Sequence, residues 1–271
     1  MDALRPVAGK STTMRLILGL DRPSGGRTTV NGRPCREHPA PLREVGALLE
    51  ARAVHPGRSA RNHLLALAQT HGISRRRVAQ VIELAGLRDV ADRRVKGFSL
   101  GMGQRLGIAA ALLGDPAVLV LDEPVNGLDP EGVLWIRTLL KGLASEGRTV
   151  LVSSHLMNEM AVTAEDVIVI GRGRLIAATS MAELTRRAHG HVRVVSPDAG
   201  RLRELLAGPD AEISAPEPGV LEVAGRTCEQ IGGLAAAHGL TLHELTPRSA
   251  TLEQVFMDLT GADVEYAGRA A

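Results

Sequence analysis

A short run of small, polar and basic residues near the N-terminus has the composition of a phosphate-binding loop. Gly9, Lys10, Ser11 and Thr12 precede the apolar residues 16–18, which predicts a loop leading into a helix. Glycine lets the backbone approach a phosphate, lysine pairs with phosphate oxygens, and a serine hydroxyl is a ligand for Mg²⁺. The full phosphate-loop pattern also requires glycine where Leu4 stands, so the formal match fails. Taken alone, such a run at a helix start is by chance more often an ordinary capped helix than a nucleotide site.

Two adjacent carboxylates follow an uninterrupted apolar run. Asp122 and Glu123 come directly after residues 118–121, which have the character of a buried parallel strand. Ligands of open α/β sheets bind at the carboxyl end of such strands, and two acids there are costly unless a cation or a substrate pairs with them. The pair therefore predicts Asp122 on Mg²⁺ and Glu123 polarising an attacking water. The alternative is a strand that ends in solvated acids.

Two weaker signals lie nearby in the sequence. Ser99 and Gly101 stand before an apolar helix, where they would form an anion seat or, in the simpler interpretation, only a helix cap. His155 follows the apolar residues 150–152. It is either a surface residue or, at the same sheet edge as the two carboxylates, a hydrogen-bond partner for a γ-phosphate.

The periodicity of the chain supplies elements that would position these residues. Two apolar runs, 118–121 and 150–152, flank a helical pattern at 130–145, which predicts a strand–helix–strand crossover. Further strands are expected at 28–31 and 45–49, and a hairpin at 167–170 and 174–177. Residues 59–114 are expected to be helical.

The C-terminal part differs in the order of its expected strands and helices. Strands, helices and strands alternate in the order β-α-β-β-α-β, expected at 191–195, 199–206, 211–214, 220–223, 228–238 and 241–245. This order is that of a ferredoxin-like module. A last helix is expected at 251–259, where Thr251 and Gln254 are spaced as a capping box.

Composition excludes several partners. The net charge of +2 and the aromatic content of 1% are typical neither of a general nucleic-acid binder nor of a membrane-interface protein, so we expect no nucleic-acid partner. The two cysteines, Cys35 and Cys228, have no metal-ligand or disulfide spacing, as in a reduced cytosolic setting. No run approaches the roughly 18 apolar residues of a membrane span, and the start lacks a signal peptide, so any membrane connection is expected to come through a partner.

In this order the motifs resemble those of the nucleotide-binding subunits of ATP-binding cassette (ABC) transporters. The resemblance runs from about residue 8 to 178 and consists of AGKSTT at 8–13, the signature motif FSLGMGQR at 98–105, the Walker B motif VLVLDEP at 118–124, the D-loop NGLD at 126–129 and the switch histidine in SSH at 153–155. The segment 245–256 is similar to the C-terminal extension of cassettes that serve drug- or antibiotic-export permeases of the ABC-2 type.

The resemblance implies an α/β fold: a P-loop NTPase of ABC type, with a parallel sheet core and a helical subdomain at about 50–115, in a nucleotide-binding domain over 1–178. An accessory α+β ferredoxin-like extension would occupy 179–271. The implied activity is ATP hydrolysis that energises export, with ATP and Mg²⁺. Implied catalytic residues are Glu123 and His155; implied nucleotide contacts are Gly9, Lys10, Ser11, Thr12, Ser99, Gly101, Gln104 and Asp129; implied metal ligands are Ser11, Asp122 and Glu50.

The resemblance also implies partners. Two such subunits, most simply a homodimer, sandwich two ATP molecules head to tail, so Ser99 and Gly101 of one copy face the nucleotide bound at Lys10 of the other. A separate membrane permease of the ABC-2 type would dock partly on the 50–70 region. The expected location is cytoplasmic, peripheral on the inner face of the cell membrane through that permease.

The sequence departs from the family pattern in three places. Leu4 and Val7 stand where the family has glycine, only residues 1–8 precede Gly9, and Glu50 stands where most relatives have glutamine. We therefore expect an N-terminally truncated cassette or a misplaced start. An alternative is a degenerate cassette that does not hydrolyse ATP and acts as a structural or regulatory partner. A soluble cassette ATPase of translation or DNA repair is a third interpretation, disfavoured by the charge and by the export-type tail.

Overall fold

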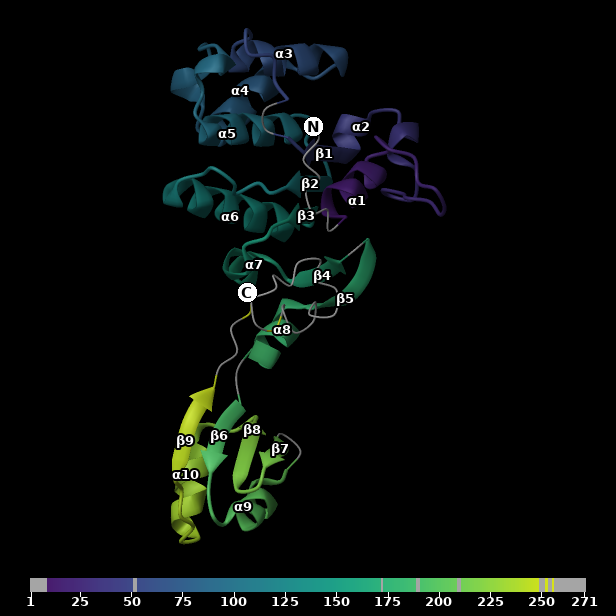
Figure 1. The fold of residues 1–271 in the computed structure, drawn as a ribbon. Helices are drawn as coiled ribbons and strands as arrows, with labels where there is room; N and C mark the ends of the chain where they lie inside the picture. The colour runs from purple at the N-terminus through teal and green to yellow at the C-terminus, as the bar shows by residue number, and fades with distance from the viewer. Residues whose placement is uncertain are drawn as a thin grey trace, which may run out of the picture. The chain divides into compact units, whose positions relative to one another are not determined.

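The computed structural model describes residues 9–50, 53–171, 173–188, 191–208 and 211–248, together with Leu252 and Val255 (Figure 1). The chain forms two compact units. The first holds the described residues up to Thr163 together with Ile170–Arg174, and the second holds Ala164–Val169 together with those from Leu175 onward. The domain boundary expected at residue 178 stays a prediction.

A parallel sheet lies at the centre of the first unit. Its strands are β1 (Val45–Leu48), β2 (Val118–Asp122) and β3 (Thr149–Ser153), in the order β1-β2-β3. Leu48 is opposite Leu121, and Asp122 is opposite Ser153. All three strands therefore end at one edge, and the central strand β2 ends in a carboxylate.

Helices cover both faces of this sheet (Figure 1). Alternate residues of β2 point to opposite sides, as they must in a strand. Leu119 and Leu121 pack into a core shared with α5 (Leu100–Ala111) and α6 (Pro130–Ser145). Val120 packs with Met14 of α1 (Lys10–Ile17) on the other side.

The expected helical segment contains α3 (Ala60–Thr70), α4 (Arg75–Leu84) and α5. Each begins after a serine whose hydroxyl accepts a hydrogen bond from the backbone N–H three residues later: Ser59, Ser74 and Ser99. The remaining short helices of the first unit are α2 (Pro41–Glu44), α7 (Met157–Thr163) and the 3₁₀ turns Cys35–Glu37, Arg88–Val90 and Val95–Gly97.

The strand expected at 28–31 is wrong. Only an isolated bridge between Val30 and Arg33 is present there. Asn31 and Gly32 have φ of 50° and 80°, so the chain reverses at once in a tight turn instead of continuing extended. The expected hairpin is confirmed as β4 (Asp166–Gly171) and β5 (Arg174–Ser180), followed by α8 (Met181–Ala188).

The C-terminal elements follow the expected ferredoxin-like order: β6 (His191–Val195), α9 (Ala199–Leu206), β7 (Glu212–Glu217), β8 (Val220–Ala224), α10 (Cys228–Ala237) and β9 (Glu244–Arg248). Their sheet has the order β7-β8-β6-β9, with every pair antiparallel. The last strand starts later than expected, because Leu240 and Leu242 pack against the core before pairing begins at Glu244. The helix expected at 251–259 lies outside the described residues except for Leu252 and Val255.

No helix in the described part of the chain has the length and apolar character that crossing a bilayer requires.

Candidate nucleotide site

The start of α1 and the end of β2 meet in the first unit. Lys10 Nζ lies 3.1 Å from Glu123 Oε1 and 3.5 Å from the carbonyl oxygen of Ser154. The Ser11 hydroxyl donates a hydrogen bond of 2.6 Å to Asp122 Oδ2. The two strongest candidates from the sequence, the basic loop and the acidic pair, therefore form one cluster.

The N-terminus of α1 has the geometry that an anion needs. Gly9 has a φ of 88°, a conformation that residues with a Cβ rarely adopt, and it begins the helix without a side-chain cap. Lys10, Ser11 and Thr12 form the first turn, whose backbone N–H groups have no partner within the helix. These N–H groups and the helix dipole favour a phosphate at this end.

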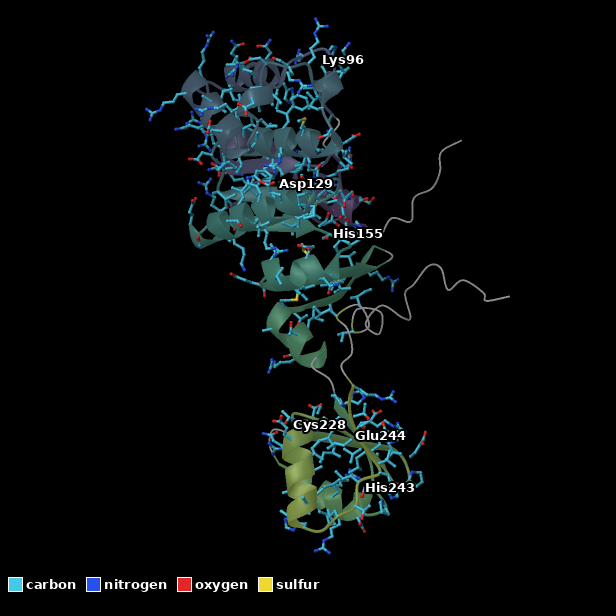
Figure 2. The ribbon with its side chains drawn as sticks, turned by 90° about the vertical axis from the view of Figure 1, so that its left-hand side faces the viewer. Lys96, Asp129, His155, Cys228, His243 and Glu244 are labelled. Carbon is cyan, nitrogen blue, oxygen red and sulfur yellow. The ribbon has the colours of Figure 1, made fainter. Side chains whose placement is uncertain are left out.

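The end of β3 holds both acids in place. Ser153 is buried; its hydroxyl donates to Asp122 Oδ1 and accepts a 3.0 Å hydrogen bond from the backbone N–H of Glu123. His155 Nδ1 lies 2.9 Å from Glu123 Oε2, and its side chain is exposed (Figure 2). His155 is a site residue that the sequence predicts, whereas Ser153 is one that it does not. The signal for Ser153 was its place as the last residue of a strand that pairs with β2.

The signature segment surrounds the start of α5. Ser99 is exposed and accepts a hydrogen bond from Met102 N at 3.2 Å. A Cβ on Gly101 would lie 3.0 Å from the carbonyl oxygen of Gly127, so the helix start packs closely on the D-loop. Gln104 is buried, and its side-chain amide donates to the carbonyl oxygen of Glu123 at 3.1 Å. As nucleotide contacts, these three residues stay predictions.

The remaining predicted site residues lie on loops of the first unit. The Asp129 carboxylate caps α6 by accepting a 2.8 Å hydrogen bond from Gly132 N, and its side chain is exposed (Figure 2). Glu50 is exposed and stands two positions after Leu48, the last residue of β1. Leu4 and Val7 lie outside the described residues.

The cluster at the start of α1 and the end of β2 has oxygen atoms that could bind a metal ion. Within the described ranges, no group of three or more His, Cys, Asp or Glu side chains could hold a metal by itself. The Asp122 carboxylate and the Ser11 hydroxyl, 2.6 Å apart, are hard oxygen donors. This set fits Mg²⁺, which binds proteins through one or two such groups and completes its shell with phosphate and water.

Known protein families match the part of the chain that holds these residues. Residues 7–126 match the ABC transporter family, and residues 190–253 match a domain of unknown function, DUF8746. The chain belongs to the ATP-binding subunits of ABC transporters, and it is an ATPase whose activity is coupled to transport.

Individual relatives cover most of the chain. The bacitracin transport ATP-binding protein BcrA of Bacillus licheniformis is 32% identical over 263 residues, which span 94% of this chain and 85% of that protein. The lantibiotic transport ATP-binding protein SrtF of Streptococcus pyogenes is 36% identical over 169 residues, which span 62% of this chain and 73% of that protein. A solved structure of an ATP-binding subunit of an ABC transporter superposes with a TM-score of 0.60 at 25% identity, over 66% of this chain and 77% of that one.

Proposed function

We propose that this subunit drives the export of a small molecule, such as a drug, an antibiotic or a lipid-like compound, through a separate membrane permease of the ABC-2 type. The observation that carries the proposal is the cluster of Lys10, Ser11, Asp122 and Glu123, which joins a phosphate-binding helix start to a pair of acids. The transport of bacitracin and lantibiotics by relatives supports the substrate class.

The phosphate side of the site is formed by α1. Gly9 and Thr12 offer backbone N–H groups, and Lys10 offers an ammonium group 3.1 Å from Glu123 that would move to the β- and γ-phosphates of ATP. Ser11 and Asp122 would hold Mg²⁺, with Glu50 as a further ligand from the same sheet edge. When bound, the ion neutralises charge on the phosphates.

The water side of the site is formed by Glu123 and His155. Glu123 is the one acid of the pair that contacts both Lys10 and His155, at 3.1 and 2.9 Å, which places its carboxylate between a cation and an imidazole. Glu123 would orient and polarise the attacking water, and His155 would donate a hydrogen bond to the γ-phosphate.

A second copy of the chain completes the proposed assembly. In a head-to-tail homodimer, the exposed Ser99 and the neighbouring Gly101 of one copy would contact the nucleotide held by the other copy, with Gln104 and Asp129 beside them. The permease would dock partly on the 50–70 region. This arrangement puts the subunit in the cytoplasm, on the inner face of the membrane.

Two lysine variants test the proposal. Lys10→Ala should abolish ATP-dependent antibiotic resistance in a sensitive bacterium that carries this chain with an ABC-2 permease. Lys96→Ala removes the same charge from an exposed turn and should leave resistance unchanged (Figure 2). Equal resistance with Lys10→Ala and with the unaltered chain would contradict the proposal.

A further inference from the structure

Glu123 has an unusual backbone conformation. Its φ is 49°, and in the described ranges only Asn31 and Asp115 share a positive φ among residues other than glycine. Asparagine and aspartate tolerate this left-handed region because their short side chains bond locally, whereas glutamate has no such compensation. The surroundings of Glu123 must therefore hold it there.

Both polar groups of the Glu123 backbone are held by other segments. Its N–H donates to the carbonyl oxygen and to the hydroxyl of Ser153, at 3.2 and 3.0 Å. Its carbonyl oxygen accepts from Gln104 Nε2 at 3.1 Å and from Asn126 N at 3.2 Å. The residue is thus fixed from β3 on one side and from α5 on the other.

Buried polar side chains are scarce in this protein, and two of them serve this one residue. The buried polar side chains of the described part are those of His38, Ser59, Gln104, Ser153 and Ser196. Gln104 is only 4% exposed, and burying an amide is unfavourable unless its hydrogen bonds are made. Gln104 is the one polar residue among the buried residues of α5, and its amide reaches the Glu123 backbone.

We infer that Gln104 is a positioning residue for Glu123, a role that rests on the proposed function of Glu123. Gln104 holds the Glu123 carbonyl oxygen and so keeps the peptide group between Glu123 and Pro124 from rotating. The backbone of Glu123 then keeps its carboxylate between Lys10 and His155. Gln104 lies on the same helix as Ser99 and Gly101. A nucleotide contact at the start of α5 is therefore connected to Glu123 through one rigid element and one hydrogen bond.

The test compares a variant of α5 with a variant of α6 by steady-state ATP hydrolysis. Gln104→Met keeps the length and the helix propensity but removes the donor, and should lower kcat roughly 10- to 100-fold while ATP affinity stays unchanged. Lys141→Met is the control, because it also replaces a donor to a backbone carbonyl by methionine, here the 3.0 Å bond from Lys141 Nζ to Val162, in a contact that does not include Glu123. Its kcat should stay the same.

A second readout does not depend on activity. Amide hydrogen exchange at Asn126, whose N–H donates to the same Glu123 carbonyl oxygen, should become faster in Gln104→Met and not in Lys141→Met, since only the first variant releases that carbonyl group. If Gln104→Met does not fold, Gln104→Asn keeps an amide that is one methylene shorter and should show the same changes to a smaller degree. Unchanged exchange, or a loss of ATP affinity in place of kcat, would overturn the inference.

The double variant separates this inference from the proposed function. Where Glu123→Gln has already removed the carboxylate, adding Gln104→Met should cause no further loss in single-turnover hydrolysis. A further loss of the same size as in the unaltered chain would mean a general structural role and would overturn the inference. Full kcat in Gln104→Met with loss in Glu123→Gln would overturn only the inference, whereas full turnover in Glu123→Gln would overturn the proposed function.

Discussion

Lys10 and Glu123 are separated by 113 positions in the sequence, yet the lysine ammonium lies 3.1 Å from the glutamate carboxylate. Their side chains are 37% and 23% exposed, so solvent screens the pair. Ion pairs of this kind contribute at most about 1 kcal/mol. Under the proposed function, a phosphate group would therefore displace Glu123 from Lys10 at little cost, and the freed carboxylate would bind water.

The contact between Ser11 and Asp122 leads to a prediction about metal dependence. Asp122→Asn should raise the Mg²⁺ concentration needed for half-maximal ATP hydrolysis roughly 10-fold or more, because the amide is a poorer ligand than the carboxylate. A magnesium titration of the hydrolysis rate measures this. Asp92→Asn is the control, since Asp92 pairs with Arg61 on the surface of the same unit. An identical titration curve for Asp122→Asn and Asp92→Asn would argue against Asp122 as a ligand.

Two glycine substitutions should have opposite effects on stability. A Cβ on Gly46 would lie 1.9 Å from the carbonyl oxygen of Ala111, so Gly46→Ala should destabilise the first unit by about 1–3 kcal/mol or more through overpacking of β1 against α5. A Cβ on Gly142 would meet nothing within 4 Å, so Gly142→Ala should stabilise α6 by about 0.5–1 kcal/mol. Denaturant unfolding measures both. A stable Gly46→Ala variant would mean that β1 and α5 are not packed this closely.

His63 should make stability depend on pH. Burial, and then the charge of Arg58, lower the pKa of His63, and its buried Nδ1 has no hydrogen-bond partner among the described residues. Below the ordinary histidine pKa of about 6.5, His63 is protonated in the unfolded chain but stays neutral in the folded chain. The free energy of unfolding is therefore highest above this pH and falls as the pH drops below it.

The measurement is denaturant unfolding at about pH 7.5 and about pH 5.5, on either side of the ordinary histidine pKa. His63→Gln should lose less stability between the two conditions than the unaltered chain. His55→Gln, at an exposed histidine, should behave like the unaltered chain. The same loss in His63→Gln would show that another group causes the pH dependence.

The sequence predicts the structure best where a local pattern determines it. The apolar run before Asp122, the serine cap before α5 and the alternating C-terminal elements all have short-range signals, and the structure has each of them. The strand expected at 28–31 is wrong because Asn31 and Gly32 form a turn, whereas the β-branched residues 28–30 before it favour a strand.

The support of Glu123 could not be predicted in the same way. Gln104 lies on α5 and Ser153 on β3, and neither the helical period nor the strand pattern says that both side chains reach the same backbone. Their convergence depends on how α5 packs against the sheet, which is a tertiary property. The burial of Gln104 follows from the packing of α5 against the sheet and has no signal in the sequence of the helix itself.

The rate of ATP hydrolysis by Glu123→Gln measures what the Glu123 carboxylate contributes to catalysis. The substitution keeps the size of the side chain and removes the carboxylate that lies between Lys10 and His155. ATP should still bind while kcat falls roughly 10²- to 10⁴-fold, the usual contribution of a general base. A Glu123→Gln protein that binds ATP and hydrolyses it at the rate of the unaltered chain would mean that Glu123 does not polarise the attacking water.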